Sequence, residues 1–186
     1  MRKIVVLDAC VLYPAHLRDF LLHLAQQKLY EPKWTDQIND EWVRNVLKNR
    51  PDLSASSFDR LRSLMNGAFP SANVKGFKPL MKGLSLPDVD DIHVLATAIK
   101  CDAAEIVTFN IKHFPSNKLV KHGIRAVHPD DFLAHLIETE PLIALMAFEN
   151  QITHLKRPPI AADDILEIFR HSNMKNSANL LEKLIH

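Results

Sequence analysis

Three aspartates lie within four residues near the middle of the chain, at the start of a predicted helix. Asp88, Asp90 and Asp91 precede residues 92–99, whose almost entirely apolar character predicts a buried helix. One aspartate is ordinary as a helix cap, because a carboxylate accepts hydrogen bonds from the free N–H groups of the first turn, and that role suits Asp88. Three carboxylates repel one another more than a cap requires. We therefore expect a positively charged group between them.

A further carboxylate follows an apolar run near the N-terminus. Residues 4–7 have the composition of a central parallel strand, and the run ends at Asp8. An ionised carboxylate at the end of a buried strand costs free energy unless it is paired or bound to a metal. We therefore favour a functional role for Asp8 over a simple turn.

Two other polar residues are candidates for the same site. Glu41 borders the apolar face of a helix predicted over residues 35–47, where it is equally well explained as a surface glutamate. Residues 105–109 predict a strand that ends at Asn110. Ligands of open α/β sheets bind where the strands end, so Asn110 is expected beside the carboxylates.

The residue types favour one class of chemistry. Carboxylates without a histidine pair or neighbouring cysteines select Mg²⁺ or Mn²⁺ over Zn²⁺, and the two cysteines, Cys10 and Cys101, lack metal-binding or redox spacing. The chain has only 4 glycines and neither nucleotide-binding glycine motifs nor a GxSxG element. Metal-assisted hydrolysis of a phosphate ester fits what remains.

Basic residues adjoin the acidic cluster. Residues 111–127 contain no acid and include Lys112, His113 and Lys118. Lysines beside a carboxylate metal site suit a polyanionic substrate. Residues 60–87 are also basic and acid-free, which is compatible with a phosphate path but is more common in a solvated face. Arg18, at the start of another predicted helix, could reach a phosphate or remain solvated.

Length and composition indicate an α/β domain with a helical appendage. The chain has 186 residues, 47% of them hydrophobic, and a net charge of +1, which argues against disorder and against generic polyanion binding. We see no signal peptide and no apolar run near the roughly 20 residues that span a bilayer, so we expect a cytoplasmic protein without membrane contact. Pro141 suggests a boundary between a first domain, residues 1–138, and a helical extension, residues 139–186. Helices are predicted in the extension over residues 142–155, 162–171 and 177–184, separated by residues 156–159 and 172–176.

Taken together, these motifs resemble those of PIN-domain nucleases, and most closely the VapC-type toxin ribonucleases. The similarity lies in IVVLDACVLYP, DEW, DDIHVLATAI and IVTFNIKHFP, which occur in the family's order and spacing over residues 1–138. The resemblance implies a PIN-like three-layer α/β/α sandwich around a twisted parallel sheet. It assigns the family's acids to Asp8, Glu41 and Asp91, and its TxN strand end to Thr108 and Asn110.

The resemblance also implies an activity and partners. Members cleave RNA phosphodiester bonds with Mg²⁺ or Mn²⁺, are inhibited by a small antitoxin protein and are often homodimers. The implied metal ligands are Asp8, Glu41 and Asp91, with Asp88 as a further candidate. A subset of the VapC-type proteins carries a C-terminal helical extension similar to this one.

One position differs from the family pattern. Where the family usually has an acid three residues after the TxN element, this chain has His113. Histidine lowers the negative charge available to a second cation, although Asp88 or Asp90 could compensate, and His113 could instead face the scissile phosphate. Two alternatives stay open: an inactive PIN domain that binds RNA or acts as a scaffold, and a phosphatase with an aspartate nucleophile. The phosphatase would require an aspartate where Cys10 stands.

Overall fold

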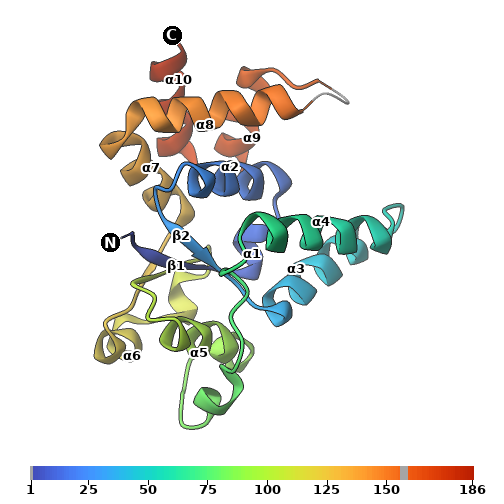
Figure 1. The fold of residues 1–186 in the computed structure, drawn as a ribbon. Helices are drawn as coiled ribbons and strands as arrows, with labels where there is room; N and C mark the ends of the chain where they lie inside the picture. Colours follow the sequence, from blue (N-terminus) through green and yellow to red (C-terminus); the bar gives the residue numbers. More distant parts are fainter. Residues whose placement is uncertain (1, 156–158) are drawn as a thin grey trace.

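A four-stranded parallel sheet lies at the centre of the computed structural model, which describes residues 2–155 and 159–186 (Figure 1). The strand order is β2-β1-β3-β4. Because β2 and β3 pair with opposite edges of β1, the chain reverses its direction of winding beside β1, and ligands of such sheets bind at this point. The strands are β1 (Ile4–Leu7), β2 (Glu31–Lys33), β3 (Glu105–Val107) and β4 (Arg125–Val127).

Helices connect these strands and cover both faces of the sheet, so the α/β class predicted from the sequence is confirmed. Figure 1 shows α2 and α5 on opposite sides of the sheet. The connecting helices are α1 (Ala9–Leu12), α2 (Ala15–Gln26), α3 (Asp36–Asn49), α4 (Ala55–Ala68), α5 (Ile92–Lys100) and α6 (Ser116–Leu119). Four 3₁₀ turns accompany them: η1 (Lys78–Met81), η2 (Val89–Asp91), η3 (Ile111–His113) and η4 (Val120–His122).

Several element boundaries differ from the sequence prediction by up to three residues, and two of these differences have a local cause. Helix α2 begins at Ala15 rather than near Arg18, because Pro14, with φ −72°, already has a backbone angle suited to entering a helix. Strand β3 ends at Val107, two residues before the predicted end. The chain turns there because the Thr108 hydroxyl accepts a hydrogen bond from the Asn110 N–H at 3.0 Å.

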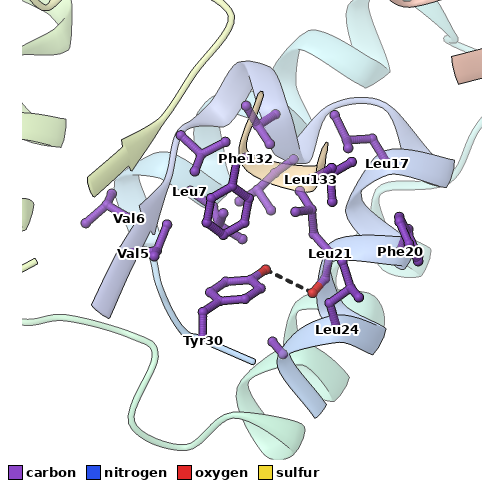
Figure 2. Close-up of a cluster of buried hydrophobic side chains, with 14 of the residues drawn as sticks. Val5, Val6, Leu7, Leu17, Phe20, Leu21, Leu24, Tyr30, Phe132 and Leu133 are labelled. Atoms are coloured by element: carbon purple, nitrogen blue, oxygen red, sulfur yellow. Dashed lines mark hydrogen bonds between the residues drawn. The ribbon is translucent and has the colours of Figure 1, made fainter. Parts of the chain in front are cut away.

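The core on one face of the sheet joins β1 to α2 and to α7 (Pro129–Thr139), as Figure 2 shows. The Tyr30 hydroxyl donates a 2.9 Å hydrogen bond to the Leu21 carbonyl, and the Tyr30 ring meets Phe132 edge-on at a centroid distance of 5.1 Å. Leu7 and Leu133 are fully buried beside them. Helix α7 therefore packs in the same core as the central strand.

Within the described residues, three helices follow α7: α8 (Pro141–His154), α9 (Ala162–His171) and α10 (Lys175–Ile185). Helices α8 and α9 pack on α2, where the Phe20 ring lies 5.6 Å from the ring of Phe148 and 6.0 Å from that of Phe169. Helix α10 packs on α7 and α9. The predicted division between residues 138 and 139 falls inside α7, one residue before the helix ends, and it stays a prediction. Of the predicted separator at residues 156–159, residues 156–158 lie outside the described part of the chain. Among the described helices, none is both long and apolar enough to cross a membrane.

Candidate metal centre

Asp8 lies at the carboxyl end of β1, where its side chain caps α1. The residue is 2% exposed. Its Oδ1 accepts a 2.6 Å hydrogen bond from the Ala9 N–H, and its Oδ2 accepts hydrogen bonds from the Thr108 hydroxyl at 2.6 Å and from the Cys10 thiol at 3.1 Å. The carboxylate is therefore fixed in one orientation from three directions.

The surroundings of Asp8 do not fully stabilise its negative charge. Burial raises the pKa of Asp8, and the hydrogen bonds from Thr108, Cys10 and Ala9 oppose this rise without cancelling it. The charge of Glu41 raises the pKa further. A cation bound here would stabilise the ionised carboxylate, because a metal ion is the largest local charge in such a site.

Asp88, Asp91 and His113 form a second group of donor atoms at the start of α5. Nδ1 of His113 lies 2.8 Å from Oδ2 of Asp91 and 3.5 Å from Oδ2 of Asp88. One donor atom from each of the three residues lies within 4.8 Å of the others. Asp88 also acts as a cap, since its Oδ1 accepts a hydrogen bond from the Asp90 N–H at 3.0 Å. We expected a positively charged group between these acids from the sequence, and the structure places the imidazole of His113 beside both of them.

Asp91 connects this group to Asp8. Burial raises the pKa of Asp91, its hydrogen bond with His113 opposes the rise, and the charges of Asp8 and Asp88 raise the pKa further. Asp91 and Asp8 therefore repel each other although they are 83 positions apart in the sequence. Asp90 does not join the group, because its side chain lines a neighbouring hollow.

Glu41 borders that same hollow on α3. Its Oε2 lies 3.4 Å from Nε2 of His93, a side chain that is almost completely buried. Nδ1 of His93 has no hydrogen-bond partner among the described residues. The hollow has a volume of about 480 Å³ and is lined by Gln37, Asp40, Glu41, Arg44, Asn45, Asp90 and His93. Glu41 is thus near enough to raise the pKa of Asp8, but it lies outside the group formed by Asp88, Asp91 and His113.

The end of β3 supplies the neutral part of the site. Thr108 is fully buried against Asp8, and Asn110 is half-buried where the chain enters η3. Cys10 is also part of the site, since its sulfur accepts a hydrogen bond from the Phe109 N–H at 3.3 Å. We assigned Cys10 no role in the site from the sequence, and its position two residues after Asp8 was the signal for one. Burial raises the pKa of the Cys10 thiol, which therefore stays protonated and donates to Asp8.

The predicted phosphate contacts have different surroundings. Lys112 is exposed beside His113, whereas Lys118 is half-buried with its Nζ 3.5 Å from the Ser85 hydroxyl. Arg18 is buried, donates a 2.6 Å hydrogen bond to the Leu12 carbonyl, and stacks 4.6 Å over the Trp42 ring. Burial lowers the pKa of Arg18 to about 10. This placement gives Arg18 a packing role between α1, α2 and α3, and it supports neither the solvated side chain nor the phosphate contact.

Part of the basic segment 60–87 is neutralised by acids on α3. Arg62 forms an ion pair with Asp40 at 2.5 Å, and Lys75 forms one with Asp36. Three of these four side chains are largely exposed, so the pairs contribute little to stability. They do reduce the positive charge that this segment offers to a polyanion.

The donor set fits a divalent cation. Asp8, Asp88 and Asp91 supply hard carboxylate oxygens, which Mg²⁺ and Mn²⁺ prefer, and His113 adds a nitrogen. Burial raises the pKa of Asp8 and of Asp91, and a cation bound here would favour their ionised form. The fold and the site thus define an α/β protein with a candidate metal centre where the winding of the sheet reverses.

Comparison with known proteins identifies the family. The family model described as PIN domain matches residues 4–112, and the one described as VapC50 C-terminal domain matches residues 129–183. The chain therefore belongs to the PIN domain family. It is 56% identical over 77 residues to a Mycobacterium tuberculosis protein named "Putative ribonuclease VapC50", a stretch that covers 41% of this chain and 46% of that protein. The chain thus matches about half of that relative's length. No solved structure matches the chain.

Proposed function

We propose that this protein is a metal-dependent endoribonuclease and the toxin of a type II toxin-antitoxin pair. The observation that carries the proposal is the gathering of Asp8, Asp88 and Asp91 around the carboxyl end of β1, in a chain of the PIN domain family. The similarity to a protein named as a ribonuclease supports RNA as the substrate.

The carboxylates would hold Mg²⁺ or Mn²⁺. Asp8 and Asp91 are the principal ligands in this proposal, and Asp88 and Glu41 contribute further negative charge. When bound, the cation activates a water molecule and stabilises the charge that develops on the phosphate. The hydrogen bond from Thr108 holds Oδ2 of Asp8 in a fixed orientation, which limits the reorganisation needed during the reaction.

The RNA backbone is proposed to follow the segment after β3. Lys112 and His113 lie on η3, and Lys118 lies on α6, so three basic side chains border the acidic cluster within seven residues. Contacts of this kind position a phosphate backbone without reading its sequence. Asn110, at the entry to η3, is proposed to contact the same phosphate.

A test of the activity compares purified protein with RNA in the presence of Mg²⁺, Mn²⁺ or EDTA. We expect cleavage of single-stranded or structured RNA that EDTA abolishes and that Asp91→Asn removes. Asp131→Asn, an exposed aspartate on α7, is the matched control and should leave cleavage unchanged. RNA binding without cleavage under all three conditions would contradict the proposal and favour an RNA-binding module.

An antitoxin partner, a homodimer and a cytoplasmic location complete the proposal. Support for a protein partner comes from a shallow groove of about 160 Å³ between α2 and α4, lined by Asp19, Leu22, His23, Gln26, Leu61, Leu64, Met65, Ala68 and Phe69. Leu64 is 60% exposed, and exposed apolar side chains beside a groove are typical of surfaces that bind an amphipathic helix. Leu64→Glu should weaken a co-expressed antitoxin complex, as measured by co-purification, without changing RNA cleavage.

A further inference from the structure

The group formed by Asp88, Asp91 and His113 contains one nitrogen donor among its oxygen donors. Its donor atoms lie within 4.8 Å of one another, and Nδ1 of His113 is 2.8 Å and 3.5 Å from the two carboxylates. Donor atoms that share one small dication, with bonds of about 2.0–2.3 Å, lie roughly 3–4 Å apart. The three side chains therefore need little movement to share an ion.

The backbone holds the imidazole in this position. His113 closes η3, where its N–H donates a 2.8 Å hydrogen bond to the Asn110 carbonyl. The next side chain, Phe114, is buried in the core and anchors the end of the turn. His113 itself is 25% exposed on its side chain, and the Asp91 side chain beside it is 13% exposed. The histidine is thus a fixed part of the site.

A fixed nitrogen donor changes which cation a site prefers. Mg²⁺ is a hard ion that takes oxygen ligands, whereas first-row transition metals accept imidazole nitrogen readily. We propose that His113 is a metal ligand and that it makes this centre select a first-row transition-metal dication, such as Mn²⁺, over Mg²⁺. The inference rests on the proposed function, because it names the cofactor preference of the same site.

The inference predicts a different result from simple charge counting. If His113 only lowered the negative charge of the site, His113→Asp would strengthen Mg²⁺ and Mn²⁺ binding by similar factors. If His113 is a ligand, His113→Asp strengthens Mg²⁺ binding and removes the nitrogen that favours Mn²⁺. The ratio of the two affinities therefore separates the two roles.

The experiment is a calorimetric titration of the metal-free, full-length protein with Mg²⁺ and with Mn²⁺ at pH 8. Wild type is compared with His113→Asp and His113→Asn. His171→Asn, an exposed histidine on α9, is the control. We expect the preference for Mn²⁺ to fall by about tenfold or more in both His113 variants and to stay unchanged in the control. Circular dichroism checks that each variant is folded.

Electron spin echo spectroscopy of bound Mn²⁺ gives a second readout, because it detects a directly coordinated nitrogen. The nitrogen signal should be present in wild type and in His171→Asn and absent in His113→Asn. The inference would be overturned if the ratio of Mn²⁺ to Mg²⁺ affinity were unchanged in the His113 variants, or if wild type lacked the nitrogen signal. If RNA cleavage were still EDTA-sensitive in that case, the proposed function would stand. Absence of both metal binding and cleavage would overturn the two together.

Discussion

The hydroxyl of Thr108 donates a 2.6 Å hydrogen bond to Oδ2 of Asp8 across 100 positions of sequence. Each residue directly follows one of two central strands, β1 and β3, which pair in parallel. The bond is therefore made at the edge of the sheet where both strands end, and it selects one orientation of the buried carboxylate.

This relationship predicts the effect of Thr108→Val, which keeps the shape of the side chain and removes the donor. The pKa of Asp8 should rise further, because the Thr108 hydrogen bond lowers it. The free energy of unfolding at neutral pH should fall by about 1–3 kcal/mol, since a buried charged acceptor is left without one of its donors. Urea denaturation measures the change. Thr108→Ser, which keeps the hydroxyl, should be more stable than Thr108→Val, and the reverse order would contradict the assigned bond.

Asp8→Asn should show how the buried carboxylate affects stability as the pH changes. Burial raises the pKa of Asp8 in the folded protein above its ordinary value of 3.8. At a pH between these two pKa values, Asp8 is protonated in the native protein and ionised in the unfolded chain. The stabilisation from this proton is complete below about pH 3.8 and is lost as the pH rises through the folded-state pKa. Asparagine does not ionise. The stability of Asp8→Asn relative to wild type should therefore increase from about pH 4 to pH 7 in metal-free buffer. If the free energy of unfolding of wild type and of Asp8→Asn changed with pH in parallel, burial would not disfavour the ionised form of Asp8. RNA cleavage should be absent in Asp8→Asn.

Elements with strong local patterns could be predicted from the sequence. Strand β1 has the predicted bounds, because four consecutive apolar residues followed by an acid indicate a buried strand and its end. Thr35, the first residue of the predicted helix, caps α3, with its hydroxyl accepting a 3.1 Å hydrogen bond from the Ile38 N–H. No comparable local pattern marks β2, whose residues Glu31, Pro32 and Lys33 are stabilised as a strand by pairing with β1.

The arrangement of the site depends on interactions between distant residues, and this limits prediction. The Asp8 and Asp91 carboxylates were recognisable one at a time, but their mutual repulsion depends on the sheet topology. Arg18 was misplaced because its stacking partner, Trp42, lies on another helix. The position of His113 between two aspartates required the turn η3, which no local pattern predicted.

The lysines beside the acidic group should contribute to RNA binding by neutralising phosphates. The double variant Lys112→Ala and Lys118→Ala should bind unrelated RNAs more weakly by similar factors. Its plot of log affinity against log salt should be shallower by about 0.7 for each phosphate of single-stranded RNA that the variant no longer neutralises. Fluorescence anisotropy at several salt concentrations measures the slope. Lys183→Ala, an exposed lysine on α10, is the control. An unchanged slope in the double variant would place the RNA on another surface, with the segment 60–87 as the next candidate.

Asp130 should stabilise the docking of α10 on α7. Its carboxylate accepts hydrogen bonds from the Asn176 N–H at 3.1 Å, and from the Ser177 N–H at 2.8 Å and hydroxyl at 2.6 Å. It thus caps α10 from another helix, since Met174 at the helix start offers no side-chain cap. Asp130→Ala should lower the free energy of unfolding by about 2–3 kcal/mol. The amides of α10 should also exchange faster with deuterium. Asp131→Ala, its exposed neighbour, should change stability by less than about 0.5 kcal/mol, and equal effects of the two variants would contradict the cap.

The contact between His93 and Glu41 leads to a prediction about positioning. His93 is 2% exposed, its Nε2 lies 3.4 Å from Oε2 of Glu41, and its Nδ1 has no partner among the described residues. Burying an imidazole that makes only one polar contact costs more free energy of desolvation than that contact returns. We therefore expect His93 to orient Glu41 toward the metal centre and not to stabilise the fold. His93→Leu should then keep or increase the free energy of unfolding and lower the kcat of RNA cleavage by about tenfold, with little change in KM.

Three further variants separate positioning from packing. His93→Gln keeps an N–H donor near the position of Nε2 and should recover most of the activity that His93→Leu removes. Combining His93→Leu with Glu41→Gln should cost no more than Glu41→Gln alone, because a residue that acts through Glu41 has nothing to orient once that carboxylate is gone. Denaturation and single-turnover cleavage are measured on wild type and on all four variants. Fully additive effects in the double variant would show that His93 affects cleavage independently of Glu41, most simply by packing at the start of α5, where it follows Asp91 by two residues.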